Sequence, residues 1–232
     1  GCFRQDRSLL VFLPDECARM KTLFFDLDGT LIDSAVGITR CVEYSLERMG
    51  HPGLPEAELR QWIGPALRVS YGQLFDHAAD IERAVAHYRE RFEIEGWREH
   101  TIYAGIGETV EAVHAAGHRL AVVTAKNEPH ARKIVTALPF GHRFEDIIGA
   151  TPDGRLSHKP ELIAEALTRL GLRPEHCTMI GDRHLDIEGA LHHGMRGIGV
   201  LGCFNSEDEL RDAGAYALVR TPEALPALLL DA

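Results

Sequence analysis

Thr22-Leu-Phe-Phe-Asp-Leu-Asp-Gly-Thr30 is the stretch that decides the fold of this chain of 232 residues. Its first four residues form a short, mostly apolar run, and polar residues with a glycine follow from Asp26 to Thr30. A run of this kind is typical of a buried strand that opens into a loop. The sequence therefore predicts two carboxyl groups, those of Asp26 and Asp28, at the end of a strand.

Four later segments also predict strands, and helical patterns alternate with them. The strand candidates are residues 118–124, 177–182, 197–201 and 215–219. Helical patterns cover residues 107–116, 128–138, 160–170 and 186–193, each followed by a glycine or a proline. This alternation predicts an α/β fold with a Rossmann-like, doubly wound parallel sheet and helices on both faces. Ligands of such sheets bind beyond the carboxyl ends of the strands, where Asp26, Thr124 and Asp182 occur.

The sequence predicts a core domain, an inserted helical domain and a separate N-terminal segment. Residues 34–103 show helical periodicity without a convincing strand, whereas residues 20–33 and 104–232 carry the sheet pattern. Because both ends of the insert border the sheet domain, we expect it to lie above the strand ends as a lid. We interpret residues 1–19 as an upstream extension or a cloning remnant. A signal peptide is the alternative, but its apolar stretch is short and Pro14 interrupts it.

Composition narrows the expected partners and compartment. With 45% hydrophobic residues the chain is globular rather than disordered. The formal charge of −10 argues against nucleic-acid polymers as partners but allows a small anionic ligand at a local cluster of donors. The five cysteines form no C-x-x-C pair, which favours a reducing cytoplasm. No apolar run approaches the roughly 20 residues that span a bilayer, so we expect no membrane partner.

Two acidic pairs follow two of the predicted strands. They are Asp26 with Asp28, and Asp182 with Asp186. Four converging carboxylates repel one another unless a cation lies among them, and an all-oxygen site that also receives phosphate favours Mg²⁺. The simpler alternatives are an ordinary Asp-Gly turn after a strand and a helix cap at Asp186. The helix-cap alternative explains one acid of the second pair better than two.

Lys159 is the candidate cation for this cluster of acids. It precedes Pro160, which is well suited to the first turn of a helix, and that helix is expected to pack on the strand that ends at Asp182. An exposed lysine on the surface is the default alternative.

Backbone and hydroxyl donors near the strand ends are the candidate anion ligands. The Thr124 hydroxyl and the N–H groups of Ala125 and Lys126 could hold phosphate oxygens. Exposed N–H groups in the turn at Gly29 and Thr30 could form a further cradle for an anion. Taken alone, Thr124 is better explained as a threonine without a function that favours a strand.

Together these segments resemble the haloacid dehalogenase superfamily of phosphatases over almost all of residues 20–230. The motifs occur in the order that the family has: Asp26-Leu-Asp-Gly-Thr30, Thr124, Lys159 and Gly181-Asp-Arg-His-Leu-Asp186. The resemblance implies that Asp26 is a nucleophile that forms an aspartyl-phosphate, and that Asp28 is the general acid and base. It also implies that Thr124 and Lys159 bind the phosphoryl group.

The same resemblance implies a magnesium site. Asp182 would hold Mg²⁺ with Asp26 and the Asp28 carbonyl, and Asp186 would ligate through water or orient Lys159. An acid at Asp28 favours phosphate-ester cleavage over carbon–halogen displacement, because a leaving alkoxide needs a proton and a halide does not.

The insert resembles the α-helical cap of phosphoglycolate phosphatase-like and 5′-nucleotidase-like members at Trp62-Ile-Gly-Pro-Ala-Leu-Arg68. Arg68 is therefore a candidate for binding a carboxylate or second anionic group of the substrate, with an exposed helix position as the equal alternative. Gly202-Cys203-Phe204 departs from the Tyr-Gly of many members. This departure leaves the choice between a small acid and a nucleotide open.

The leading hypothesis is a Mg²⁺-dependent phosphatase that acts on a small phosphorylated metabolite, as a monomer or a homodimer. A phosphotransferase of the sugar-phosphate mutase type on the same scaffold is one alternative. A non-enzymatic phosphate-sensing module is another, although a sensor gains nothing from an acid that protonates a leaving group.

Overall fold

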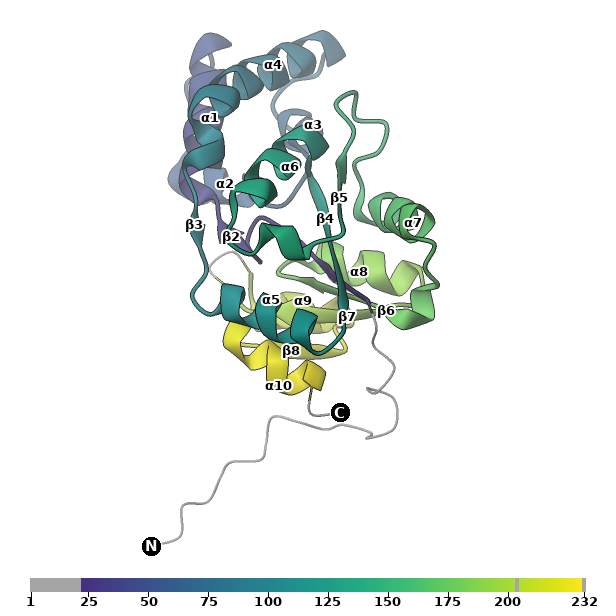
Figure 1. Cartoon of the computed structure of the whole chain (residues 1–232). Coiled ribbons are helices and arrows are strands. Elements are labelled where there is room, and N and C mark those ends of the chain that lie inside the picture. Colours follow the sequence, from purple (N-terminus) through teal and green to yellow (C-terminus); the bar gives the residue numbers. More distant parts are fainter. Residues whose placement is uncertain (1–21, 203–204, 231–232) are drawn as a thin grey trace, which may run out of the picture.

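The computed structural model describes residues 22–202 and 205–230 (Figure 1). The predicted N-terminal segment, residues 1–19, and the departure at Cys203 and Phe204 lie outside the described residues.

Six parallel strands form the main sheet, in the order β5-β4-β1-β6-β7-β8. Their bounds are β1 Thr22–Phe25, β4 Arg119–Asn127, β5 Asp146–Ala150, β6 Cys177–Gly181, β7 Arg196–Val200 and β8 Ala217–Val219. Phe25, the last residue of β1, pairs with Val122 on one side and Ile180 on the other. The carboxyl ends of β1, β4 and β6 are therefore neighbours, and the predicted Rossmann-like α/β class is confirmed.

Side chains of β1 alternate between two apolar layers, so helices cover both faces of the sheet. Leu23 and Phe25 belong to a cluster with residues of α5 (Ile106–Ala115), α6 (Glu128–Ala137) and α10 (Leu225–Leu230). Phe24 belongs to the opposite cluster, with α7 (Lys159–Leu170) and α8 (His184–His192). The short α9 (Glu207–Asp212) begins at Ser206, whose hydroxyl accepts a hydrogen bond from the Glu209 N–H. Single 3₁₀ turns complete this part: η4 Gly141–Arg143, η5 Pro174–His176 and η6 Pro222–Ala224.

Two details of the sheet differ from the sequence prediction. The edge strand β5 was not predicted, because its five residues begin with Asp146, include Gly149 and give too short an apolar run. The predicted end of β4 at Thr124 was also wrong, since the strand continues to Asn127. The reason is tertiary: Asn127 pairs with Ala150 of β5 after a shift in register.

Helices lie between the strands β2 (Ile32–Asp33) and β3 (Thr101–Ile102), which pair antiparallel. These helices are α1 Ala35–Arg48, α2 Glu56–Leu59, η2 Arg60–Trp62, α3 Leu67–Tyr71, α4 Ala78–Ile94 and η3 Gly96–Arg98. In Figure 1, α1 and α4 lie side by side at the end of the molecule away from α10, and the Ser45 hydroxyl donates to the Ala84 carbonyl between them (2.7 Å). The two-residue strands are too short to show the alternation by which a strand is predicted.

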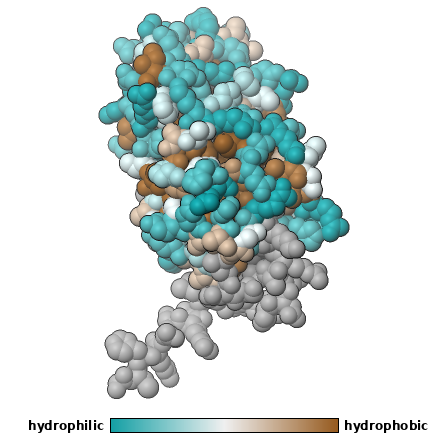
Figure 2. All heavy atoms as spheres, viewed as in Figure 1, coloured by the Kyte–Doolittle hydropathy of each residue, from teal (hydrophilic) through white to brown (hydrophobic). Residues whose placement is uncertain are grey.

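Hydrophilic residues dominate the face drawn in Figure 2, and hydrophobic residues form small groups mainly across its middle. None of the helices within the described residues is both long and apolar enough to cross a membrane.

Candidate active site

The ends of β1 and β6 bring three carboxylates together. Asp26 follows β1, Asp182 follows β6, and Asp186 lies in the first turn of α8; one carboxylate oxygen from each lies within 4.8 Å of the others. Burial raises the pKa of Asp26 to about 6, against the opposing effect of Lys159. Burial, with Asp186 and Asp26 nearby, also holds the pKa of Asp182 well above its usual range. The raised pKa values show that Asp26 and Asp182 need nearby positive charge to stay ionised.

Lys159 supplies part of that charge at the start of α7. Its Nζ atom lies 2.7 Å from Asp186 Oδ1 and 3.1 Å from Asp26 Oδ1, and it donates to the Val123 carbonyl at 3.0 Å. Burial alone lowers the pKa of Lys159, but Asp186 and Asp26 together raise it above its usual range. The lysine is therefore charged and fixed, unlike the exposed lysine of the alternative reading.

The cluster fits a hard divalent cation. Three carboxylates face one ammonium group, and oxygen ligands are the set that Mg²⁺ and related ions prefer. Two glycines permit the approach: a Cβ at Gly29, whose φ is +84°, would collide with the Asp182 carboxylate, and a Cβ at Gly181 would collide with that of Asp186. Asp186 Oδ2 also accepts the Arg183 N–H (3.0 Å), so the residue caps α8 while it faces Lys159.

The Asp28 carboxylate is absent from this three-acid cluster within the described residues and makes separate contacts. Its Oδ2 lies 2.8 Å and its Oδ1 3.0 Å from Lys126 Nζ, and Oδ1 accepts the Ser34 hydroxyl at 2.5 Å. Lys126 Nζ also lies 5.1 Å from the centre of the Phe92 ring in α4. The sequence predicted Lys126 as an anion ligand through its backbone N–H. In the structure, its side chain forms an ion pair with Asp28, the predicted general acid.

The candidate anion ligands make contacts within the protein. Thr124 Oγ1 accepts the Lys126 N–H (3.2 Å), and the Thr30 hydroxyl donates to Asp182 Oδ1 (3.3 Å). The N–H of Gly29 donates to the Ile32 carbonyl at 2.8 Å, and that of Thr30 to the Leu27 carbonyl at 3.4 Å. These two N–H groups already serve the turn, and their part in phosphate binding stays a prediction.

A small cavity of about 60 Å³ lies beside Asp28 and Lys126. Ala125 lines it, as does Arg68, the residue proposed from the helical insert. The Arg68 guanidinium makes two contacts with the Glu82 carboxylate (2.5 and 2.8 Å) and donates to the Pro152 carbonyl at 3.0 Å. Arg68 therefore faces the predicted site with its charge already paired.

No motif in the sequence pointed to Ser34, Arg89 or Asn127, although all three lie at this site. Arg89 and Asn127 line the same cavity, and Ser34 contacts Asp28. The spacing of Val85, Arg89 and Phe92 along one face of α4 is the signal that could have revealed Arg89, since its neighbours on that face are buried.

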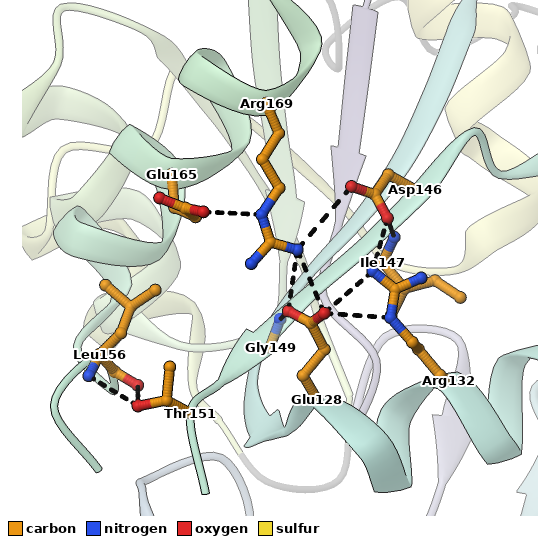
Figure 3. A network of polar contacts seen from close by, with 9 residues as sticks. All are labelled: Glu128, Arg132, Asp146, Ile147, Gly149, Thr151, Leu156, Glu165 and Arg169. Atoms are coloured by element: carbon orange, nitrogen blue, oxygen red, sulfur yellow. Dashed lines mark hydrogen bonds and ion pairs between the residues drawn. The ribbon is translucent and has the colours of Figure 1, made fainter. Parts of the chain in front are cut away.

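A polar network outside the site holds the edge strand in place (Figure 3). Glu128, at the start of α6, accepts hydrogen bonds from Arg132, from Arg169 of α7 and from the Gly149 N–H of β5. Asp146 accepts from Arg132 at 2.6 Å. The network joins α6, α7 and β5. Lys126 lies shortly before α6, Lys159 is the first residue of α7, and β5 ends at Ala150, where the next loop begins.

Buried paired carboxylates at the end of a central parallel strand, a fixed lysine and a second strand-end acid define a class of α/β hydrolases that act on phosphate esters. A family model described as haloacid dehalogenase-like hydrolase matches residues 23–200. The chain belongs to this family, and it is a phosphatase of the haloacid dehalogenase-like type.

Similar proteins differ in their named activities. A 5′-nucleotidase of Pseudomonas aeruginosa is 45% identical over 201 residues, which cover 86% of this chain and 90% of that protein. The tyrosine-protein kinase PtkA of Mycobacterium bovis is 38% identical over 174 residues, which cover 75% of this chain and 59% of the kinase. The crystal structure of a predicted phosphatase from Clostridium acetobutylicum has a TM-score of 0.87 and 33% identity, covering 92% of this chain and 99% of that one.

Proposed function

We propose that the protein is a Mg²⁺-dependent phosphatase that hydrolyses a small phosphate monoester through an aspartyl-phosphate on Asp26. The observation that carries the proposal is the position of Asp26, 3.1 Å from the buried Lys159 ammonium and within the three-acid cluster. A fixed cation beside the attacking carboxylate reduces the electrostatic repulsion between that carboxylate and the phosphoryl oxygens.

Asp26 attacks the phosphorus atom, and the bond from phosphorus to the ester oxygen breaks. Lys159 holds one oxygen of the transferred group and keeps Asp26 oriented, and Thr124 offers its hydroxyl to another oxygen. Asp26, Asp182 and the Asp28 carbonyl would hold the Mg²⁺ ion, with Asp186 outside them. When bound, the ion supplies positive charge that offsets the oxygens of the phosphoryl group.

Asp28 protonates the leaving oxygen and later deprotonates the water that hydrolyses the acyl-phosphate. Both of its carboxylate oxygens contact Lys126, and Oδ1 also contacts Ser34. An acid needs one free oxygen to deliver a proton, so substrate binding moves Lys126 from Asp28 toward the phosphate oxygens. Lys126 is thus a positioning residue for the acid and a ligand for the substrate.

Residues 34–103 act as the cap, with the β2–β3 pair as the connection to residues 20–33 and 104–232. Trp62, Arg68 and Phe92 of this region line the cavity with Asp28, which supports control of access by these helices. The substrate is a small phosphorylated metabolite and the compartment is the cytoplasm. The buried and unpaired Cys41 and Cys177 support a reducing compartment.

The test is phosphate release with Mg²⁺ from phosphoglycolate, nucleoside monophosphates and sugar phosphates, with Asp26→Asn as the blank. During turnover, borohydride reduction should convert Asp26 to homoserine, which peptide mass spectrometry identifies. Phosphate release by Asp26→Asn at the wild-type rate, or homoserine at another position, would overturn the mechanism. Transfer to a second sugar-phosphate hydroxyl without phosphate release would indicate the mutase.

A further inference from the structure

The cavity beside Asp28 carries one positive charge that no carboxylate matches. Three cationic side chains line it: Arg68, Arg89 and Lys126. Lys126 pairs with Asp28, and Arg68 pairs with Glu82. Arg89 makes no ion pair with any of residues 22–202 or 205–230; its Nη2 atom donates only to the Pro152 carbonyl, at 3.0 Å. Burial and the neighbouring Arg68 lower the pKa of Arg89, against the opposing effect of the Glu82 carboxylate that Arg68 binds.

The imidazole of His130 also lines the cavity but adds no charge near neutral pH. Burial lowers the pKa of His130 to about 4, although the Glu93 carboxylate at 2.6 Å opposes that effect. The surplus charge of the cavity therefore rests on Arg89.

Two buried donors of the same cavity have no hydrogen-bond partner in the described part of the chain. They are Arg89 Nε and Asn127 Nδ2. Buried polar groups without partners are rare in folded proteins and are costly where they occur. Because both residues line one cavity, a ligand whose anionic oxygens reach the two buried donors would satisfy both at once.

The backbone acceptor that holds Arg89 is itself fixed. Pro152 lies in the loop that Thr151 and Leu156 close. The Thr151 N–H donates to the Leu156 carbonyl (2.8 Å). The Leu156 N–H donates to the Thr151 hydroxyl (3.0 Å) (Figure 3). The Glu128 network restrains β5 directly before this loop. The Arg89 guanidinium is thus held in place before any ligand arrives.

Building on the proposed function, we propose that Arg89 and Asn127 bind a carboxylate on the leaving group of the substrate, so that the preferred ester is a small phosphorylated acid. One unmatched positive charge suits a singly charged carboxylate better than a second phosphate. An adjoining cavity of about 400 Å³, lined by Asp26 and Lys159, shares Ala125 with this one, so charge rather than volume selects the acid.

The experiment compares two esters of equal size that differ in this charge. Values of kcat/KM are measured for 2-phosphoglycolate and for 2-hydroxyethyl phosphate, and their ratio is the selectivity. We expect Arg89→Gln to lower the selectivity by about 10- to 100-fold, the effect of one charge-assisted contact. Asn127→Asp, nearly equal in shape, should lower it as well, because it adds a negative charge where the carboxylate binds. Arg83→Gln on the same helix is the matched control, since Arg83 is exposed, does not line this cavity and forms an ion pair with Asp80.

Equal losses for both esters in Arg89→Gln and Asn127→Asp would overturn the inference, as would a wild-type preference for a nucleoside monophosphate over phosphoglycolate. Either result leaves the phosphatase itself established. Failure of the proposed function looks different, because wild-type protein would then release no more phosphate than Asp26→Asn from any ester. Melting temperatures of all variants show whether a loss reflects unfolding.

Discussion

The Lys126 ammonium lies 2.8 Å from Asp28 Oδ2, although the two residues are 98 positions apart in the chain. Asp28 follows β1, and Lys126 lies near the end of β4, the strand next to it in the sheet. Both side chains are nearly buried, with 8% and 7% of their surface exposed. The pair therefore joins the predicted acid to the cavity that Arg68 and Arg89 line.

Replacing Lys126 with Met should slow the reaction and leave the fold intact. The variant loses the proposed contact of Lys126 with the substrate phosphate and leaves the Asp28 carboxylate without its ion pair. We therefore expect kcat/KM to fall by about 10- to 100-fold. Steady-state phosphate release measures this. Lys133→Met is the control, because Lys133 pairs with the half-exposed Glu93 outside the cavity. An unchanged kcat/KM in Lys126→Met would contradict the role given to this lysine.

Replacing Lys159 with Met should damage both stability and turnover. The change leaves the carboxylates of Asp26 and Asp186 without their buried partner. Breaking such an arrangement costs about 3–5 kcal/mol in the free energy of unfolding. Urea denaturation measures the loss, and saturating Mg²⁺ should recover part of the stability without turnover. A variant as stable as the wild type would show that Lys159 does not balance the acids.

Gly29→Ala should destabilise the protein more than Gly50→Ala does. Both glycines have positive φ angles, +84° and +70°, so both substitutions carry a backbone cost of about 1 kcal/mol or more. Only at Gly29 would the new Cβ collide with Asp182, while the space around Gly50 is open. The difference between the two melting temperatures isolates the collision. Equal losses would mean that the close approach of Gly29 to Asp182 is unimportant.

His130 should make the protein less stable on acidification, against the opposite contribution of Asp26 and Asp182, whose pKa values are raised. Its pKa is lowered to about 4 in the folded protein, mainly by burial, against about 6.5 in the unfolded chain. Between those values the unfolded state binds more protons, so the contribution of His130 to the free energy of unfolding rises with pH. That contribution is lost as the pH falls from 6.5 to 4. The expected contribution is about 1–3 kcal/mol.

Denaturation of His130→Gln at a series of pH values tests this effect. The variant should lose most of that pH dependence, whereas His114→Gln, at an exposed position of α5, should keep it. An unaltered slope in His130→Gln would assign the acid sensitivity to other groups.

The sequence determined the parts of this protein that depend on local pattern. Apolar runs such as residues 22–25 predicted the central strands, and their polar ends marked Asp26, Thr124 and Asp182 at one edge of the sheet. The ordered motifs indicated the family that the comparisons confirm. These features are readable because a strand and its turn are specified by residues that are adjacent in the chain.

Only the tertiary structure decided the rest. Edge strand β5 is held by pairing with β4 and by the Glu128 network, neither of which leaves a strong local pattern. The contacts of Lys126 with Asp28 and of Arg89 with Pro152 join residues from separate elements. Whether a cation is paired or unmatched depends on its burial and on the charges around it. Three-dimensional packing rather than residue type decides both.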